Sequence, residues 1–143
     1  MFYSDSTNLL YVSGTNDWGR LTQGGHNSEA NMLFYRVLTT GSTLATWASA
    51  LTLSTVWASL AHTLQSSINK QLFSHSTSAF VDSDTSPTIY PQDANSLALA
   101  YGISPLNTTS LISQQLLTNW DPIGAISPEP PPTTSTSTPP PSK

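Results

Sequence analysis

The residues of this sequence that offer chemistry are carboxylates and aromatic rings that lie between apolar segments. Six of the eight acids are candidates, Asp17, Glu29, Asp82, Asp84, Asp93 and Asp121, with Trp18 after the first and Trp120 before the last. Two carboxyls across a glycosidic bond can hydrolyse it, because one protonates the leaving oxygen while the other activates water. An aromatic ring beside them can hold the apolar face of a sugar. Taken singly, the same acids also suit helix caps and solvated loops, so both interpretations stay open.

Other site chemistries have no support in the sequence. It contains no Gly-rich phosphate loop, no HExxH pair, no EF-hand loop and no GxSxG motif. Cysteine is absent, which excludes disulfides and thiolate metal ligands. The three histidines, His26, His62 and His75, are scattered along the chain, which favours surface or helix histidines over ligands. We therefore expect no metal site and no cofactor.

Composition narrows the range of partners. The 143 residues carry a net charge of −4, and only 8% are charged, whereas Ser and Thr together supply 43 positions. The chain lacks the basic surface that phosphate neutralisation requires, so we expect neither nucleic acid nor an anionic membrane as a partner. There is no run of 18 apolar residues and no basic segment followed by an apolar run at the start, which predicts neither a membrane span nor a signal peptide. The compartment stays open, and an extracellular location would suit a longer parent protein.

Apolar periodicity predicts an antiparallel pair of helices in the first half of the chain. Apolar residues recur at helical spacing over about Ser28 to Trp47, with Asn27 or Ser28 as the N-terminal cap and Glu29 in the first turn. Gly41 weakens this helix without ending it. A second stripe covers about residues 53–72. The short link between the two stripes predicts an αα-hairpin.

A second pair of helices is expected after a polar break. Residues 79–87 are predicted to be an extended loop that ends at a turn. Pro91 suits the first position of a helix that carries Asp93 in its first turn and ends at Gly102. A last helix is expected over about residues 108–117. With no convincing set of strands, the predicted class is all-α, built from consecutive αα-hairpins.

The chain is expected to end in a tail that does not fold. Residues 128–143 contain only Pro, Ser, Thr, one Glu and a final Lys, a composition that has nothing to bury and favours disorder with polyproline II character. The prediction is therefore one helical domain over residues 1–127, followed by a disordered tail.

Four strings occur in an order that resembles a known family. They are Gly14-Thr15-Asn16-Asp17-Trp18-Gly19-Arg20, Asn27-Ser28-Glu29-Ala30-Asn31-Met32-Leu33-Phe34-Tyr35-Arg36, Tyr90-Pro91-Gln92-Asp93-Ala94-Asn95-Ser96-Leu97-Ala98-Leu99 and Asn119-Trp120-Asp121-Pro122-Ile123-Gly124-Ala125. Together they resemble fungal proteins of the α-L-rhamnosidase type, the six-hairpin glycosidases of glycoside hydrolase family seventy-eight. The resemblance implies an (α/α)6 toroid of helical hairpins, of which this chain would form part, and a rhamnoside-type carbohydrate as partner.

The resemblance also implies roles for individual residues. Trp18 would stack on the sugar and Asp17 would accept sugar hydroxyls, with Gln92 and Asp93 as further substrate contacts. Asp93 is equally well explained as a partner of the helix dipole, and for Glu29 this is the favoured role. The family's catalytic acid and base strings are absent, so the catalytic residues are unknown. The chain is expected to be a fragment of an inverting glycoside hydrolase that is inactive alone. The alternative is a non-enzymatic helical module that binds sugar or another partner.

Overall fold

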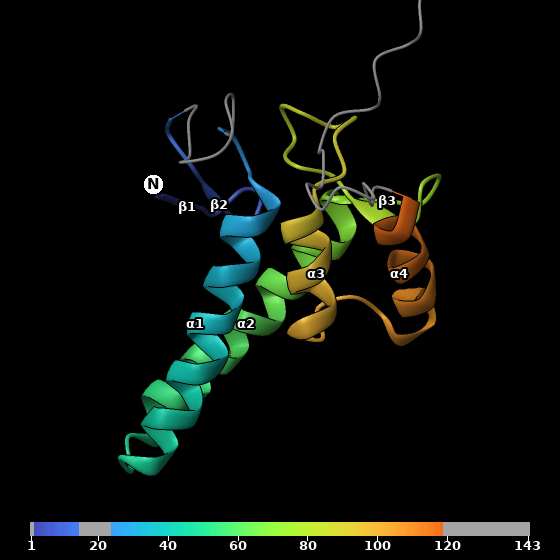
Figure 1. The fold of residues 1–143 in the computed structure, drawn as a ribbon. Coiled ribbons are helices and arrows are strands. Elements are labelled where there is room, and N and C mark those ends of the chain that lie inside the picture. Colours follow the sequence, from blue (N-terminus) through green and yellow to red (C-terminus); the bar gives the residue numbers. More distant parts are fainter. Residues whose placement is uncertain (1, 15–23, 119–143) are drawn as a thin grey trace, which may run out of the picture.

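The structure, a computed structural model, describes residues 2–14 and 24–118 and is mostly helical (Figure 1). Its elements are β1 (Phe2–Ser4), β2 (Leu9–Tyr11), α1 (Ser28–Trp47), α2 (Leu51–Gln71), β3 (Phe73–Ser74), β4 (Ala79–Phe80), α3 (Gln92–Ala100), the 3-10 turn Leu106–Thr108 and α4 (Thr109–Thr118). The helices confirm the predicted mostly helical class, and each lies close to its predicted range. Pro91 stands just before α3 as its N-cap residue, with φ −72° and ψ 148°. The predicted tail, residues 128–143, lies outside the described residues.

The expectation that no strands would form is wrong. Strands β1 and β2 pair antiparallel with Tyr3 opposite Leu10, and β3 and β4 pair antiparallel with Phe73 opposite Phe80. Each strand has only two or three residues, too few to show the alternation that identifies strands in a sequence.

Helices α1 and α2 form the predicted antiparallel hairpin, which projects beyond α3 and α4 (Figure 1). Gly41 lies where the two helices approach closely. A Cβ at that position would lie 2.9 Å from the Trp57 ring, so glycine is what lets the indole lie against α1. Near the far end, the Ser42 hydroxyl donates to the Ser54 carbonyl at 2.9 Å.

The core lies at the other end of this hairpin, where α1, α2, α3, α4 and the two β-hairpins meet. Its fully buried side chains include Met32, Leu64, Ile68, Phe80 and Ile112. The Phe73 ring packs edge-on against Phe80 with the centroids 5.0 Å apart. Burial of such apolar surface is the main stabilising contribution to a fold of this size. Within residues 2–14 and 24–118, no helix is both long enough and apolar enough to cross a bilayer.

The fold contains the same structural unit twice, and a buried asparagine identifies each copy. The Asn31 side chain accepts the Leu10 N–H at 2.7 Å and donates to the Leu10 and Asn27 carbonyls at 3.0 and 2.8 Å. The Asn95 side chain accepts the Phe80 N–H at 2.8 Å and donates to the Phe80 and Pro91 carbonyls at 2.9 and 2.8 Å. Each asparagine therefore fastens a β-hairpin to the first turn of the helix that follows it.

The turns of the two β-hairpins match as well. Asn8 and Ser78 occupy equivalent places and both have φ of 55°. The hydroxyls of Ser4 and Ser6 lie 3.0 Å apart in the first turn, and those of Ser74 and Ser76 lie 3.1 Å apart in the second. We call β1, β2, α1 and α2 the first module, and β3, β4, α3 and α4 the second module.

The two modules pack side by side through their helices and through backbone groups. The Ser28 N–H at the start of α1 donates to the Asp82 carbonyl at 2.8 Å. On α2, the side-chain amides of Gln65 and Asn69 donate to the Ile103 carbonyl at 3.1 and 2.8 Å. The Arg36 guanidinium lies over the Tyr101 ring, 5.5 Å from its centroid. Both modules therefore place the first turn of their first helix at the same end of the molecule (Figure 1).

Candidate functional site

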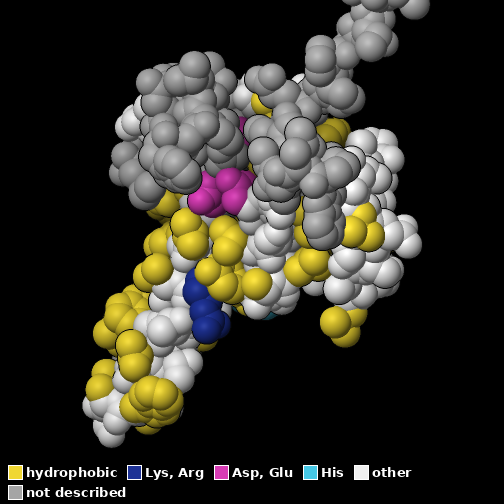
Figure 2. Space-filling view, in the orientation of Figure 1, with side chains coloured by type: hydrophobic (Ala, Val, Ile, Leu, Met, Phe, Trp, Pro, Cys, Tyr) yellow, Lys and Arg dark blue, Asp and Glu magenta, His cyan; other side chains and the backbone are white. Residues whose placement is uncertain are grey.

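The residues with candidate chemistry gather at the end of the molecule where α1 and α3 begin. We call this region the loop end and define it, among the described residues, as Tyr11 and residues 24–29 and 82–93. Figure 2 shows acidic side chains together near the starts of these helices. The free N–H groups of a helix's first turn carry partial positive charge, so two helix N-termini at one end favour negative charge there.

The start of α1 is fixed by Asn27. Its side chain accepts the Ala30 N–H at 2.9 Å, which confirms the predicted cap. The Ser28 hydroxyl donates to the Val81 carbonyl of the second module. Glu29 follows in the first turn and is half-buried. Because its neighbours on both sides are held by hydrogen bonds, the Glu29 backbone has a fixed place at the loop end.

The start of α3 carries the two predicted contact residues that the structure describes. Gln92 and Asp93 are both half-buried. Asp93 accepts the Ala94 N–H through Oδ1 at 2.7 Å, while Pro91 provides no side-chain cap. The interaction with the helix N-terminus that we expected for Asp93 is therefore present. In the repeated unit, the position of Asp93 in α3 is equivalent to the position of Glu29 in α1.

A histidine and an aspartate join the two modules across the loop end. His26 Nδ1 lies 2.6 Å from Asp84 Oδ2, and the His26 backbone N–H donates to Asp84 Oδ1 at 2.9 Å. Partial burial alone would raise the pKa of Asp84, but these hydrogen bonds and the charge interaction with His26 outweigh it and lower the pKa below its ordinary value of 3.8. The ionised carboxylate accepts the Nδ1 proton. In the neutral imidazole, Nε2 is then the acceptor for the Thr7 hydroxyl at 3.1 Å.

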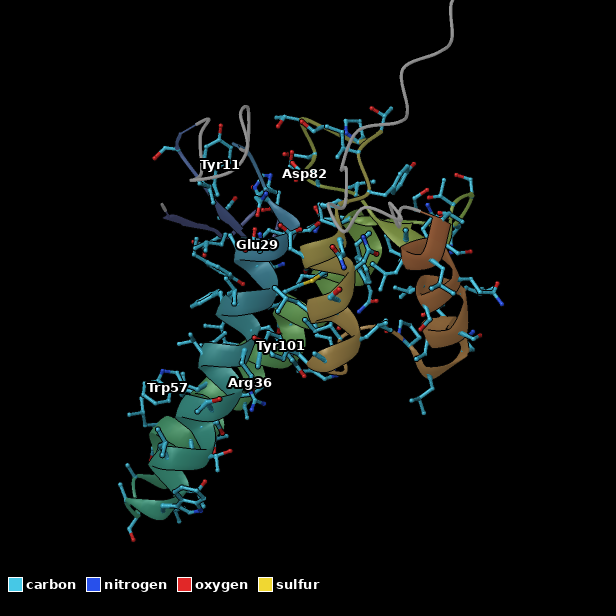
Figure 3. The ribbon with its side chains drawn as sticks, in the orientation of Figure 1. Tyr11, Glu29, Arg36, Trp57, Asp82 and Tyr101 are labelled. Carbon is cyan, nitrogen blue, oxygen red and sulfur yellow. The ribbon has the colours of Figure 1, made fainter. Side chains whose placement is uncertain are left out.

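Aromatic rings and a buried acid complete the loop end. The Tyr11 ring meets the His26 ring edge-on, with centroids 5.3 Å apart, and Tyr90 lies half-buried just before α3. Asp82 is 1% exposed. Its backbone carbonyl accepts the Ser28 N–H at the start of α1, and its backbone N–H donates to the Ile89 carbonyl. Figure 3 labels Tyr11, Glu29 and Asp82 at this end. Asp82 therefore has a supporting position, while Glu29 and Asp93 are half-buried at the starts of the two helices.

The structure brings together part of the predicted site. Gln92 and Asp93 lie at the same end as Glu29, which the resemblance also included. Asp17 and Trp18 lie outside the described residues. The pairing of His26 with Asp84 was not predicted, because the scattered histidines were interpreted as surface or helix residues. The repeat was not predicted either. Alignment of Glu29-Ala30-Asn31 with Asp93-Ala94-Asn95 would have revealed that signal.

Elsewhere the surface is hollowed beside the first β-hairpin. A groove of about 800 Å³ lies between this hairpin and α2, with Tyr3, Asn8, Thr52, Thr55, Val56, Ser59, Leu60 and Thr63 as its lining. Among the described residues that line this groove, Tyr3 is the only one with an ionisable side chain. In the part of the chain that the structure describes, no three His, Cys, Asp or Glu side chains gather in a way that could hold a metal ion.

Comparison with known proteins adds no assignment. No protein-family model matches the chain. No curated protein matches it either. The candidate site therefore rests on the geometry of the loop end and on the residues themselves.

Proposed function

We propose that this chain binds carbohydrate at the loop end and forms the sugar-contact part of a glycosidase of the α-L-rhamnosidase type. In this proposal the two modules are successive helical hairpins of an (α/α)6 toroid. Two features support this arrangement: the modules repeat the same unit, and they pack side by side with their first helices starting at the same end. Stacked helical repeats of this kind bury a continuous core between neighbours.

The observation that carries the proposal is the equivalence of Glu29 and Asp93. A carboxylate at the same place in each repeat, in the first turn of a helix at the loop end, gives two acceptors for sugar hydroxyls. Tyr11 and Tyr90 add aromatic surface near them, and rings of this kind pack on the apolar face of a sugar. In this proposal Trp18 supplies the main stacking ring, Asp17 accepts hydroxyls, and Gln92 and Asp93 are further contacts.

Hydrolysis by this chain alone is not part of the proposal. Inverting hydrolysis needs a general acid and a general base on opposite sides of the scissile bond, and the resemblance assigns neither to a residue of this sequence. The expected result is no release of nitrophenol from a nitrophenyl α-L-rhamnoside. Turnover that the substitution Asp17→Asn abolishes would instead show that the chain holds catalytic carboxylates of its own.

Binding is tested by titration of methyl α-L-rhamnoside into the full chain, followed by NMR and by calorimetry. We expect saturable binding that Trp18→Ala reduces at least tenfold and that Asp93→Asn and Gln92→Ala reduce by smaller factors. Trp47→Ala is the matched control, because Trp47 is 76% exposed at the far end of α1. Equal loss of binding in Trp18→Ala and Trp47→Ala would contradict sugar binding at the loop end.

The second candidate is a non-enzymatic interaction module. The observation that favours it is the apolar surface at the far end of the α1–α2 hairpin, where Trp47 and Leu51 are 76 and 64% exposed. Exposed apolar residues that lie together mark interaction surfaces. Binding that distinguishes L-rhamnosides from other glycosides supports the glycosidase relationship. Binding of no sugar, or of several sugars equally, supports the interaction module.

A further inference from the structure

The repeat identifies a surface of the first module that the described residues of the second module do not cover. In α3, Leu97 and Tyr101 are partly buried against the core that the two modules share, and the Arg36 guanidinium of α1 lies over the Tyr101 ring. Their equivalents in α1, matched through Asn31 and Asn95, are Leu33 and Val37. Leu33 is 43% exposed and Val37 is 65% exposed. The same two apolar positions are therefore covered in the second module and open in the first.

Helix α2 also has a side that faces away from the second module. Gln65 and Asn69 of α2 bind the second module through the Ile103 carbonyl. Val56 and Leu60 line the groove of about 800 Å³ beside the first β-hairpin. At 3.6 residues per turn, these two pairs lie on opposite sides of the helix. We call the surface formed by Leu33, Val37 and this groove the front flank.

The second module carries a surface that is equivalent to the one with which the first module contacts it. In the first module, Ser28 and Arg36 of α1 make contacts with the second module. Their equivalents in α3 are Gln92, half-buried, and Ala100, exposed. We call the α3 surface that carries Ser96 and Ala100 the rear flank. The rear flank of the second module corresponds to the surface with which the first module already binds the second.

We propose that the front flank binds the rear flank of a second copy of this chain. The contact between the modules provides the template for this interface, because the first module already presents the equivalent surface to α3. A copy carries both halves of the interface on opposite sides, so association is head-to-tail and the two copies contribute different surfaces. Nothing in this inference depends on sugar binding, and the stacking keeps the loop ends of successive copies on one side.

The test uses two variants that each block one half of the interface. Val37→Arg places a charge on the front flank, and Ala100→Arg places one on the rear flank. Both positions are exposed, so neither change disturbs the core. Molar mass is measured by sedimentation and light scattering on the full chain, from about 1 μM to about 1 mM, the range in which weak interfaces associate. Trp47→Arg is the control for general apolar adhesion, since Trp47 is exposed and lies outside both flanks.

The expected outcome is specific to a head-to-tail interface. The unmodified chain and Trp47→Arg should gain mass with concentration, and Val37→Arg and Ala100→Arg should each stay monomeric. A mixture of the two monomeric variants should form a one-to-one dimer, because the first retains the rear flank and the second the front flank. Helical circular dichroism confirms that each variant is folded. A monomeric unmodified chain at every concentration, or association that only Trp47→Arg abolishes, would overturn the proposal.

Discussion

The buried asparagines give the sharpest test of the repeated unit. Asn95 is 1% exposed and satisfies three backbone groups: the Phe80 N–H, the Phe80 carbonyl and the Pro91 carbonyl. Asn95→Ala leaves the Phe80 N–H and the Phe80 carbonyl without this partner, whereas the Pro91 carbonyl still accepts the Asn95 backbone N–H at 3.3 Å. Each buried polar group that loses its hydrogen bond costs about 1–3 kcal/mol, so the two Phe80 groups together cost about 4 kcal/mol. This is a large part of the roughly 5–15 kcal/mol that holds a domain folded.

Asn31→Ala should cost the same within about 1 kcal/mol, because Asn31 is 0% exposed and has the equivalent partners. The free energy of unfolding is measured by urea titration with circular dichroism, and the thermal midpoint should fall by at least about 15 °C. Asn107→Ala is the matched control. Asn107 is exposed in the 3-10 turn, so its change should stay within about 0.5 kcal/mol.

The outcome that refutes this reasoning is a small effect in either module. A loss below about 1 kcal/mol for Asn95→Ala would mean that water or a relaxed backbone replaces the three hydrogen bonds. A large loss for one asparagine with a negligible loss for the other would mean that the two modules are not equivalent in energy.

Three further changes test the electrostatics and the close approaches of the fold. Asp84→Asn should destabilise the protein by up to about 1 kcal/mol, since Asp84 is 45% exposed and solvent screens its pairing with His26. The pKa of Asp84 is lowered in the folded protein, so the contribution of its carboxylate to stability is present above pH 3.8 and is lost as the pH falls below that value. In thermal melts from pH 7 to pH 3, the midpoints of the unmodified chain and of Asp84→Asn should therefore converge. Gly41→Ala should cost about 1 kcal/mol in urea titrations, because the new Cβ meets the Trp57 ring, and the cost should disappear in combination with Trp57→Leu. Gly102→Ala should cost about 1 kcal/mol by the same measurement, because Gly102 has a φ of 62° where a Cβ is strained although nothing lies within 4 Å; no loss would exclude that strain.

The helices were predictable because their information is local. Apolar spacing, the Asn27 cap and the break at Gly102 each act within one or two turns, and the observed helices α1 to α4 follow them closely. The sequence predicted that Gly41 weakens α1, but not its close approach to Trp57, since Trp57 lies on the other helix.

The β-hairpins and the loop end were not predictable in the same way, because their partners are distant in sequence. Leu10 is held by Asn31, 21 positions along the chain. His26 is held by Asp84, 58 positions away. The short windows of sequence in which periodicity and caps are recognised do not contain both members of such a pair. Comparison of one half of the sequence with the other would have found the repeated asparagine, but not the link between His26 and Asp84, which lies between the modules.

The most direct test of carbohydrate binding at the loop end is an NMR titration of the assigned chain with methyl α-L-rhamnoside. We expect saturable shift changes at the backbone amides of Glu29 and Asp93 and at the Trp18 indole, with the Trp47 indole unchanged. Shifts confined to the far end of the α1–α2 hairpin, or no saturable shifts at all, would contradict carbohydrate binding at the loop end.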